Sequence, residues 1–221
     1  MQITKIKKKI NKKKLFEITS IIQSENKSSI ISSLSKRNIV LFLEKTIESK
    51  KLELFVATYK KRIVGYAIVA LRNKYLKQVF NQYILNFLFD LIFRLKIVTL
   101  LNASMSYMKL DNIFLGKFEK EKISNSINLN MIAIHKKHQS KGIGEKLMKF
   151  IIKDFRKDSN YISCEIENLR SKKFYQKKLG FKQVGIILRI PKLMQILIKK
   201  IWSFSYKSLK LNKQWSLYNF L

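Results

Sequence analysis

Apolar side chains recur at helical spacing in two segments near the N-terminus. In residues 14–23 and 37–49 they return every three or four positions, the period that places them on one face of a helix. A stretch rich in Ser, Asn and Lys lies between the two segments, so we expect two helices and a connection. Residues 1–9 mix isoleucines with lysines, which is typical of an edge strand protected by charge.

The next two segments have a strand pattern. Residues 52–59 and 62–71 are rich in apolar and β-branched types, and only Lys60 and Lys61 separate them. This spacing predicts a β-hairpin. Gly65 lies inside the second strand, where it favours a bulge.

Residues 74–107 are rich in apolar and aromatic types at near-helical spacing. We predict two helices there, about 74–89 and 91–107. Asp90, Arg94 and Lys96 interrupt the apolar run, so it is not a membrane span. Three interpretations stay open: a helical cap over the substrate side of the protein, a monotopic membrane contact, or an oligomer interface.

A basic glycine loop lies between a strand pattern in residues 127–134 and a helix pattern in residues 143–155. Strand, loop and helix in this order can hold a phosphate, because loop amides and the helix N-terminus favour an anion and Gly142 and Gly144 let the backbone approach it. The loop lacks the Gly-Lys-Ser/Thr ending of a P-loop and the third glycine of a dinucleotide fold.

A second strand and short helix follow. Residues 161–166 have a strand pattern, and Asn168 is a good N-cap for a helix. Phe174 and Tyr175 supply that helix with an apolar face, and Gly180 stands where a C-terminal glycine belongs.

Together these motifs resemble a known family. Gln139-x-x-Gly142-x-Gly144, followed by a strand, Asn168, Phe174-Tyr175 and Gly180-Phe181, resembles the two signatures of the GNAT superfamily of N-acetyltransferases. The resemblance covers about residues 51–185. It implies an α/β (α+β) fold with a mixed central sheet that is splayed at the acetyl-CoA strand. Residues 1–221 would form one domain, with a helical insertion at about 74–107.

The resemblance also implies the residues that bind acetyl-CoA. The main chain of Ile132, Ala133 and Ile134 would pair with the pantetheine arm and the thioester carbonyl, where a backbone donor stabilises an oxyanion. Asn168 would contact the same arm, or act only as an N-cap. The pyrophosphate loop would consist of Gln139, Ser140, Lys141, Gly142, Ile143 and Gly144. Ser140 stands where the family often has glycine, which is tolerable if its φ is negative.

Two candidate catalytic residues follow from the same resemblance. Tyr175 matches the family tyrosine that protonates the coenzyme sulfur. For the base, some members carry a glutamate where this chain has Ser163, and others carry one in the strand before the loop. Glu165, two residues after Ser163 and on the same strand face, is our candidate. A solvated glutamate, with proton removal through water, is the alternative.

No metal site is predicted. His135 and His138 are three residues apart, but no third ligand is placed near them.

The C-terminal part has three predicted features. Residues 182–187 should be a strand, and residues 215–221 the last strand, beside the strand that follows the glycine-loop helix. Between them, about 191–210, a basic segment with helical period predicts an amphipathic helix, either interfacial or packed on the domain. Earlier in the chain, residues 113–126 read as a charged connection.

Composition adds a large positive charge. The chain has 46 Lys+Arg against 14 Asp+Glu, a formal net charge of +32. This excess favours polyanions or acidic membranes as partners. The alternative is mutational, because Lys, Asn and Ile dominate together as in a genome poor in G and C. Cys164 is the only cysteine, which excludes an intrachain disulfide, and residues 1–14 lack a secretory pattern, so we expect a cytoplasmic protein.

The sequence thus predicts an acetyl-CoA-dependent N-acetyltransferase that moves an acetyl group to a primary amine by direct attack on the thioester. The expected acceptor is an amino sugar or another small-molecule amine. Alternatives are acetylation of a protein or peptide amine, and a basic membrane- or nucleic-acid-binding protein on the same fold. No RNA-binding signature is present, so no specific nucleic acid is expected. Peripheral contact with an anionic inner membrane face and a homodimer stay open.

Overall fold

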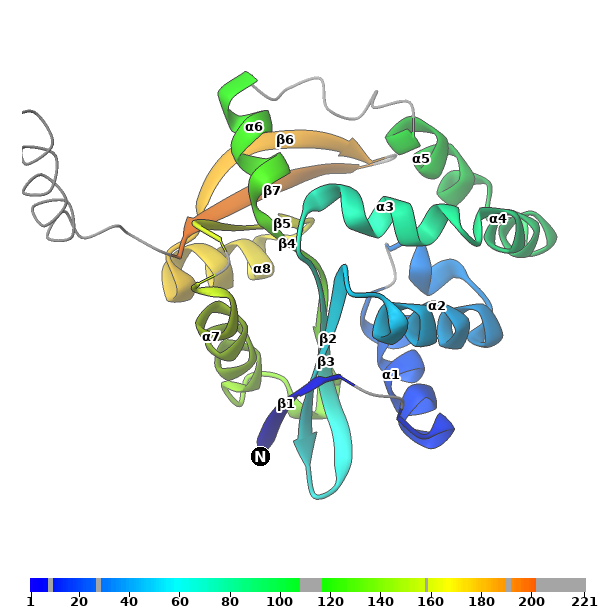
Figure 1. Ribbon diagram of the computed structural model, residues 1–221, viewed down its shortest axis with the longest axis horizontal. Helices are drawn as coiled ribbons and strands as arrows, with labels where there is room; N and C mark the ends of the chain where they lie inside the picture. The colour runs from blue at the N-terminus through cyan, green and yellow to red at the C-terminus, as the bar shows by residue number, and fades with distance from the viewer. Residues whose placement is uncertain (8–9, 27–28, 108–116, 158, 190–191, 202–221) are drawn as a thin grey trace, which may run out of the picture.

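The protein is built around one mixed sheet (Figure 1). The computed structural model describes the chain except residues 8–9, 27–28, 108–116, 158, 190–191 and 202–221. The strand order is β1-β2-β3-β4-β5-β7-β6, and every neighbouring pair is antiparallel except β4–β5, which is parallel. The strands are β1 (Gln2–Ile6), β2 (Leu52–Tyr59), β3 (Arg62–Ala70), β4 (Ile127–Ile134), β5 (Tyr161–Ile166), β6 (Lys182–Arg189) and β7 (Lys192–Lys200). The predicted mixed α/β architecture is confirmed.

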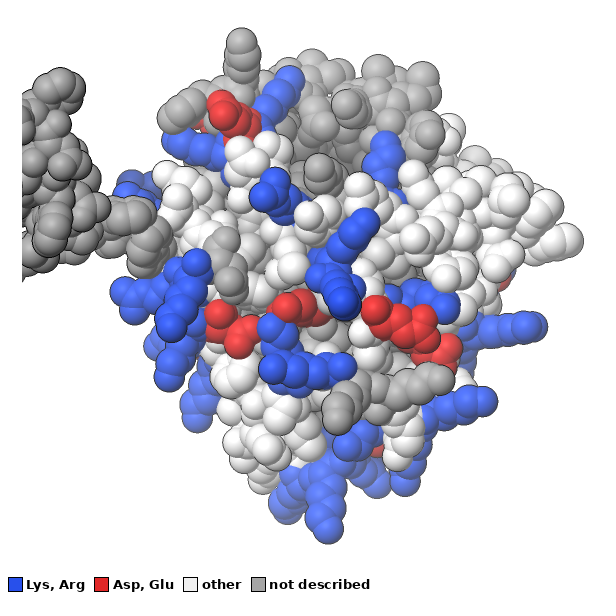
Figure 2. Space-filling model, viewed as in Figure 1, with Lys and Arg blue, Asp and Glu red and all other residues white. Residues whose placement is uncertain are grey.

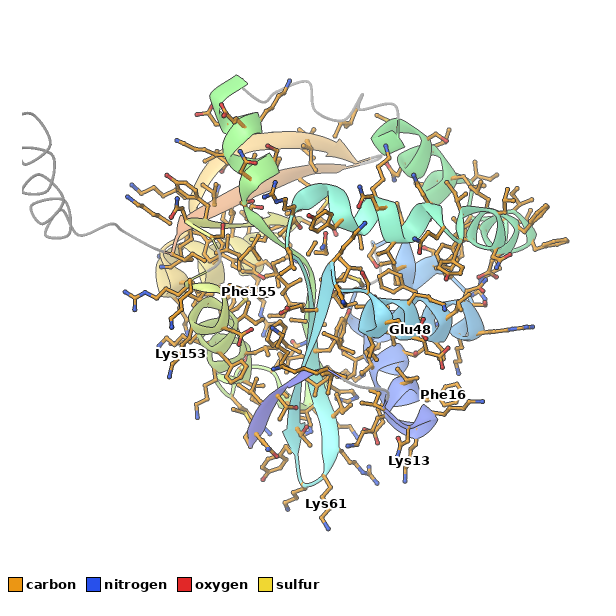
Figure 3. The ribbon with its side chains drawn as sticks, in the orientation of Figure 1. Lys13, Phe16, Glu48, Lys61, Lys153 and Phe155 are labelled. Carbon is orange, nitrogen blue, oxygen red and sulfur yellow. The ribbon has the colours of Figure 1, made fainter. Side chains whose placement is uncertain are left out.

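Helices cover both faces of this sheet. They are α1 (Lys12–Glu25), α2 (Lys36–Glu48), α3 (Asn73–Asn81), α4 (Ile84–Phe93), α5 (Ile97–Tyr107), α6 (Lys117–Asn125), α7 (Ile143–Phe155) and α8 (Leu169–Lys173). α1 and α2 pack on one face, and α7 packs on the other (Figure 1). On α7, Phe155 points toward the sheet and meets Phe55 edge-on with ring centroids 5.8 Å apart, while Lys153 points outward (Figure 3). The apolar faces predicted for α1, α2 and α7 therefore pack against the sheet.

The first hairpin forms as predicted. Lys60 and Lys61 make the turn with φ of 47° and 65°, the left-handed conformation of a tight turn whose twist matches the strands. The register shifts beside Gly65, because Ala57 pairs with Gly65 and Thr58 with Ile63. The predicted bulge is confirmed.

The sheet opens between β4 and β5. These strands pair only at their beginnings, from Ile127 with Ile162 to Leu129 with Cys164. β4 continues to Ile134, held by β3 on its other side. The β3–β4 register also shifts, since Met131 and Leu129 pair with successive residues of β3 and Asn130 is left out of the ladder. The predicted splay is therefore present, and one edge of residues 130–134 faces the opening.

The insertion contains three helices, not the two that we predicted. The C-cap of α4 is Arg94, and the helix stops there because the next residue, Leu95, adopts a left-handed φ of 51°. The Leu95 amide donates to the Ile92 carbonyl and the Lys96 amide to the Leu91 carbonyl, both at 2.9 Å. α3 lies against β3, β4 and α6, on the face of the sheet that carries α1 and α2. α4 and α5 instead pack against each other, and α4 packs beside α2.

Two predictions for the C-terminal half are wrong. Residues 192–200 form β7, not an amphipathic helix, and residues 202–210 of the predicted helix lie outside the described residues. β7 pairs with β5 on one side and β6 on the other, and this double pairing buries the run Ile196–Ile198, whose continuous apolar character fits either period. β7 also takes the place beside β5 that we assigned to residues 215–221, which themselves lie outside the described residues.

The predicted charged connection is also partly helical. Residues 117–125 form α6, whose Ile123 is buried against β6 and β7. Charged residues dominate this segment, so its pattern carried little helical signal. Among the described residues no helix has the length and apolar character needed to cross a membrane.

Gly65 allows β3 and the end of β4 to approach closely. A Cβ at this position would lie 2.3 Å from Cδ1 of Ile134 and 3.1 Å from the carbonyl oxygen of Ala133. We expect Gly65→Ala to lower the free energy of unfolding by about 1–3 kcal/mol, as overpacking does. Urea denaturation measures this. Gly144→Ala is the matched control, because a Cβ there meets only ordinary contacts at 3.7 Å; equal losses in both variants would contradict the steric explanation.

Candidate active site

The glycine loop presents unpaired amides at the start of α7. Gly142 is the N-cap of this helix with φ of 72°, and no side chain caps it. The first helical bond runs from the Lys146 amide to the Gly142 carbonyl at 3.0 Å, so the amides before it have no acceptor within the helix. Together with the helix dipole they favour an anion. A Cβ at Gly142 would meet nothing within 4 Å, so its glycine serves the left-handed conformation.

Glu25, at the end of α1, holds the loop in place. Its carboxylate accepts hydrogen bonds from the Lys136 amide at 3.1 Å and from Nε2 of Gln139 at 2.9 Å. Nε2 of Gln139 also donates to the Ile134 carbonyl at 2.8 Å. The side chain of Gln139 is thus engaged in fixing the loop, and a direct role in phosphate binding stays a prediction. No local pattern in the sequence indicated this role of Glu25.

Ser140 does not meet the condition of a negative φ under which a serine is tolerable at this position. Its φ is 61°, in the region that glycine favours, so the serine is strained here. Its Oγ accepts a hydrogen bond from Nη2 of Arg170 at 3.2 Å, which links the loop to α8. We did not predict Arg170 as a site residue. The position of Arg170, in the first helical turn after the Asn168 cap, could have indicated that it lies near the site.

The other loop residues have different surroundings. Lys141 is exposed, and Ile143 is buried against Ala57 and Val64, where it anchors the first turn of α7. Gly144 faces Ile134 and Phe174. The loop therefore lies directly against the end of β4, whose residues Ile132 and Ile134 are only partly buried.

Tyr175 lies beside the point where β4 and β5 separate. Its ring is 4% exposed and stacks edge-on between Phe174 and Phe181, with both centroid distances 5.2 Å. Leu129 and Cys164 form the last β4–β5 pair, and Cys164 is close enough to Tyr175 to influence the pKa of its hydroxyl. Burial, and then Cys164, raise the pKa of Tyr175 well above its ordinary value. The hydroxyl therefore stays protonated at neutral pH.

The segment that carries Tyr175 is irregular. Asn168 caps α8 as predicted, with its Oδ1 accepting from the Ser171 amide at 2.8 Å. After α8 the chain makes a π-helical turn, Phe174–Lys178. The helical segment is followed by Gly180, which has a φ of 69°. Such turns often occur at functional sites. Contact of Asn168 with the pantetheine arm stays a prediction.

Ser163, where the resemblance places a glutamate in some family members, belongs to a buried polar cluster. Oγ of Ser163 lies 2.6 Å from Oγ of Ser126 and 3.4 Å from Nδ2 of Asn128, and all three residues are buried. Glu165 is exposed and lies one residue beyond Cys164, on the opposite face of the sheet. Glu165 and Tyr175 therefore lie on opposite sides of the β4–β5 opening.

The two histidines of the loop contact each other, with ring centroids 6.1 Å apart. Burial, followed by the charges of Lys141, His135 and Lys137, lowers the pKa of His138, so this ring is neutral at pH 7. Within the described part of the chain no three His, Cys, Asp or Glu side chains are grouped as metal ligands.

Comparison with known proteins agrees with this geometry. Residues 114–181 match the family model of the acetyltransferase (GNAT) family. No curated protein matches the chain. The matched residues include the glycine loop, Asn168 and Tyr175, which are the parts of the site described above.

Several solved structures share the fold. An N-acetyltransferase from Staphylococcus aureus Mu50 has a TM-score of 0.56 at 14% identity, covering 91% of this chain and 99% of its own. The ribosomal-protein-S18-alanine N-acetyltransferase of Escherichia coli has a TM-score of 0.55 at 13% identity, covering 92% and 97%. A polyamine N-acetyltransferase of Drosophila melanogaster has a TM-score of 0.55 at 10% identity, covering 90% and 100%. The family match thus covers residues 114–181, and the fold shared with these N-acetyltransferase structures extends over about nine tenths of the chain.

The strain at Ser140 leads to a test. We expect Ser140→Gly to raise the free energy of unfolding by about 1 kcal/mol, because glycine adopts a left-handed φ without the cost that serine bears. Urea denaturation measures the change. Lys141→Gly is the control in the same loop: Lys141 has no positive φ, so glycine there should lower the free energy of unfolding. Destabilisation by both variants would contradict the strain.

Proposed function

We propose that the protein is an acetyl-CoA-dependent N-acetyltransferase that moves an acetyl group to a primary amine by direct attack on the thioester. One observation carries this proposal: β4 leaves β5 after Leu129 and leads, with one edge free, into a loop of unpaired amides. A free strand edge followed by an anion site matches a ligand with an amide-bearing arm at one end and phosphates at the other.

The residues at hand fit this co-substrate. Main-chain groups of Ile132, Ala133 and Ile134 would pair with the pantetheine arm as an added strand does. The α7 amides, with the charges of Lys141 and Arg170 beside them, would bind the pyrophosphate. Acetyl-CoA supplies the activated acetyl group when bound. A β4 amide facing the opening would then donate to the thioester oxygen as negative charge develops on it.

The proton path is supported by the placement of two side chains. Tyr175, kept protonated by burial, would donate its hydroxyl hydrogen to the departing sulfur. Glu165, exposed on the other face, would take a proton from the amine, directly or through water. The amine would therefore approach from the face that carries α3 and α6, which contact β4 and β5 respectively.

Charge restricts the acceptor class. With a net charge of +32, and lysines spread over the face seen in Figure 2, the protein repels polycations, attracts anionic molecules and does not repel neutral ones. The charge therefore disfavours a polyamine or a basic protein tail as acceptor, and it leaves an amine carried on a neutral or anionic molecule, such as an amino sugar, as the favoured class. The relatives named above for polyamine and ribosomal-protein acetylation therefore do not set the acceptor here.

Coenzyme binding is the first test. We expect acetyl-CoA to raise the thermal unfolding midpoint of the wild type, because a ligand at about 100 times its Kd adds about 2.7 kcal/mol. Gly142→Glu should weaken binding at least about tenfold, since a carboxylate would stand at the anion site. Gly142→Ala is its matched control, with the same left-handed φ and no charge. Calorimetric titration measures all three.

Absence of acetyl-CoA binding by the wild type would overturn the proposal. Equal affinities of Gly142→Glu and Gly142→Ala would show that the glycine loop does not bind the pyrophosphate. Thiol release with amino sugars, polyamines and peptides as acceptors then tests the class of amine. A preference for polyamines would contradict the charge argument.

Proton donation by Tyr175 is the second test. We expect Tyr175→Phe to lower kcat by about 10²–10⁴, as loss of a general acid does, while the Kd for acetyl-CoA stays unchanged. Tyr161→Phe, on the adjoining strand, is the control and should retain wild-type kcat. Glu165→Gln should also lower kcat, because the attacking amine would lose its proton acceptor. Wild-type turnover by Tyr175→Phe would show that another group protonates the sulfur.

A further inference from the structure

The turn between α4 and α5 exposes an apolar tip. Phe93 is 82% exposed, Leu95 80% and Ile97 64%. They belong to a larger surface, since eight of the thirteen large hydrophobic side chains exposed among the described residues lie between residues 85 and 101. Because α4 and α5 pack against each other, these side chains lie near one another, and exposed apolar surface of this kind marks an interaction site. It lies at the end of the molecule away from α7 and α8 (Figure 1).

Cations alternate with the apolar side chains of this tip. Arg94 and Lys96 separate Phe93, Leu95 and Ile97, and both are exposed. The turn also holds Leu95 in a left-handed φ of 51° while its side chain stays in solvent. Leu95 therefore gains little burial within the described part of the chain to offset this backbone conformation.

The only acidic side chain of α4 and α5 is turned toward the protein. Oδ2 of Asp90 accepts the Ser35 amide at 2.6 Å, at the N-terminus of α2. This contact brings the exposed cations that follow Ser35, Lys36 and Arg37, to the same end of the molecule. The apolar surface thus has positive side chains beside it and no free carboxylate of its own helices.

We infer that the α4–α5 hairpin docks on an anionic lipid bilayer, with Phe93, Leu95 and Ile97 entering the headgroup region and Arg94 and Lys96 binding lipid phosphates. The combination of an apolar wedge and flanking cations is that of an interfacial segment. Neither helix can cross a membrane, so the contact is monotopic. A second copy of the chain fits less well, because a two-fold contact would bring like cations and two chains of +32 together. The inference does not depend on the acetyltransferase activity.

Vesicle sedimentation tests this docking. Full-length protein is mixed with vesicles of phosphatidylcholine alone or of equal parts phosphatidylcholine and phosphatidylglycerol, at raised salt to suppress non-specific attraction. We expect Phe93→Asp to lower partitioning onto the anionic vesicles at least about tenfold. Phe16→Asp is the matched control, with the same change of charge at an exposed phenylalanine of α1 (Figure 3); it should bind as the wild type does. The joint variant Arg94→Gln, Lys96→Gln should lose the preference for anionic vesicles.

A fluorescent label locates the contact. Cys164 is buried, so a cysteine placed at residue 93 or 16 is the accessible thiol of each variant. An environment-sensitive dye at residue 93 should shift to the blue on anionic vesicles, and the same dye at residue 16 should not. Equal partitioning of Phe93→Asp and Phe16→Asp, or a shift at residue 16 alone, would overturn the inference. Light scattering gives one further outcome. If the wild type is a dimer and Phe93→Asp is a monomer with unchanged vesicle binding, the inference is also overturned, because a second copy would then cover the hairpin.

Discussion

The hydrogen bonding between β4 and β5 ends after Leu129, and the active-site architecture depends on this early end. Parallel strands that stayed paired would satisfy each other's backbone groups and leave no edge for a ligand. The bulge at Asn130 lies at the same place, and it bends β4 while β3 continues to hold it. Residues 130–134 thereby combine a fixed position with a free edge, which a flexible loop could not offer.

Contacts from three separate parts of the chain position the end of β4 and the loop that follows it. Gly65 lets β3 approach the end of β4, Glu25 fixes the loop that follows β4, and Arg170 links that loop to α8. The buried cluster of Ser126, Asn128 and Ser163 fills the base of the opening on one face, and Tyr175 fills it on the other. The chemistry of the site thus rests on contacts between segments that are distant in the sequence.

Much of the fold could be predicted because its signals are local. The periods of α1, α2 and α7, the Lys60-Lys61 turn, the Asn168 cap and the C-terminal Gly180 each reflect dihedral preferences of a few residues. The failures occurred where one pattern fits two structures. Leu193 to Ile198 is apolar at both periods, and only pairing with β5 and β6 made it a strand. The α4–α5 break depended on a left-handed leucine, which residue type does not suggest.

By itself, the sequence determined that one strand leads into a glycine loop and that a second strand leads into a capped helix. Local residue types decide this, because Gly142, Asn168 and Gly180 suit backbone geometry that nearby residues dictate. Tertiary structure decided where β4 parts from β5, that Glu25 holds Gln139, that Ser140 is strained, and that Phe93 and Leu95 face solvent. The physical reason is that strand pairing and exposure depend on which distant segments meet, and a linear pattern carries no record of that.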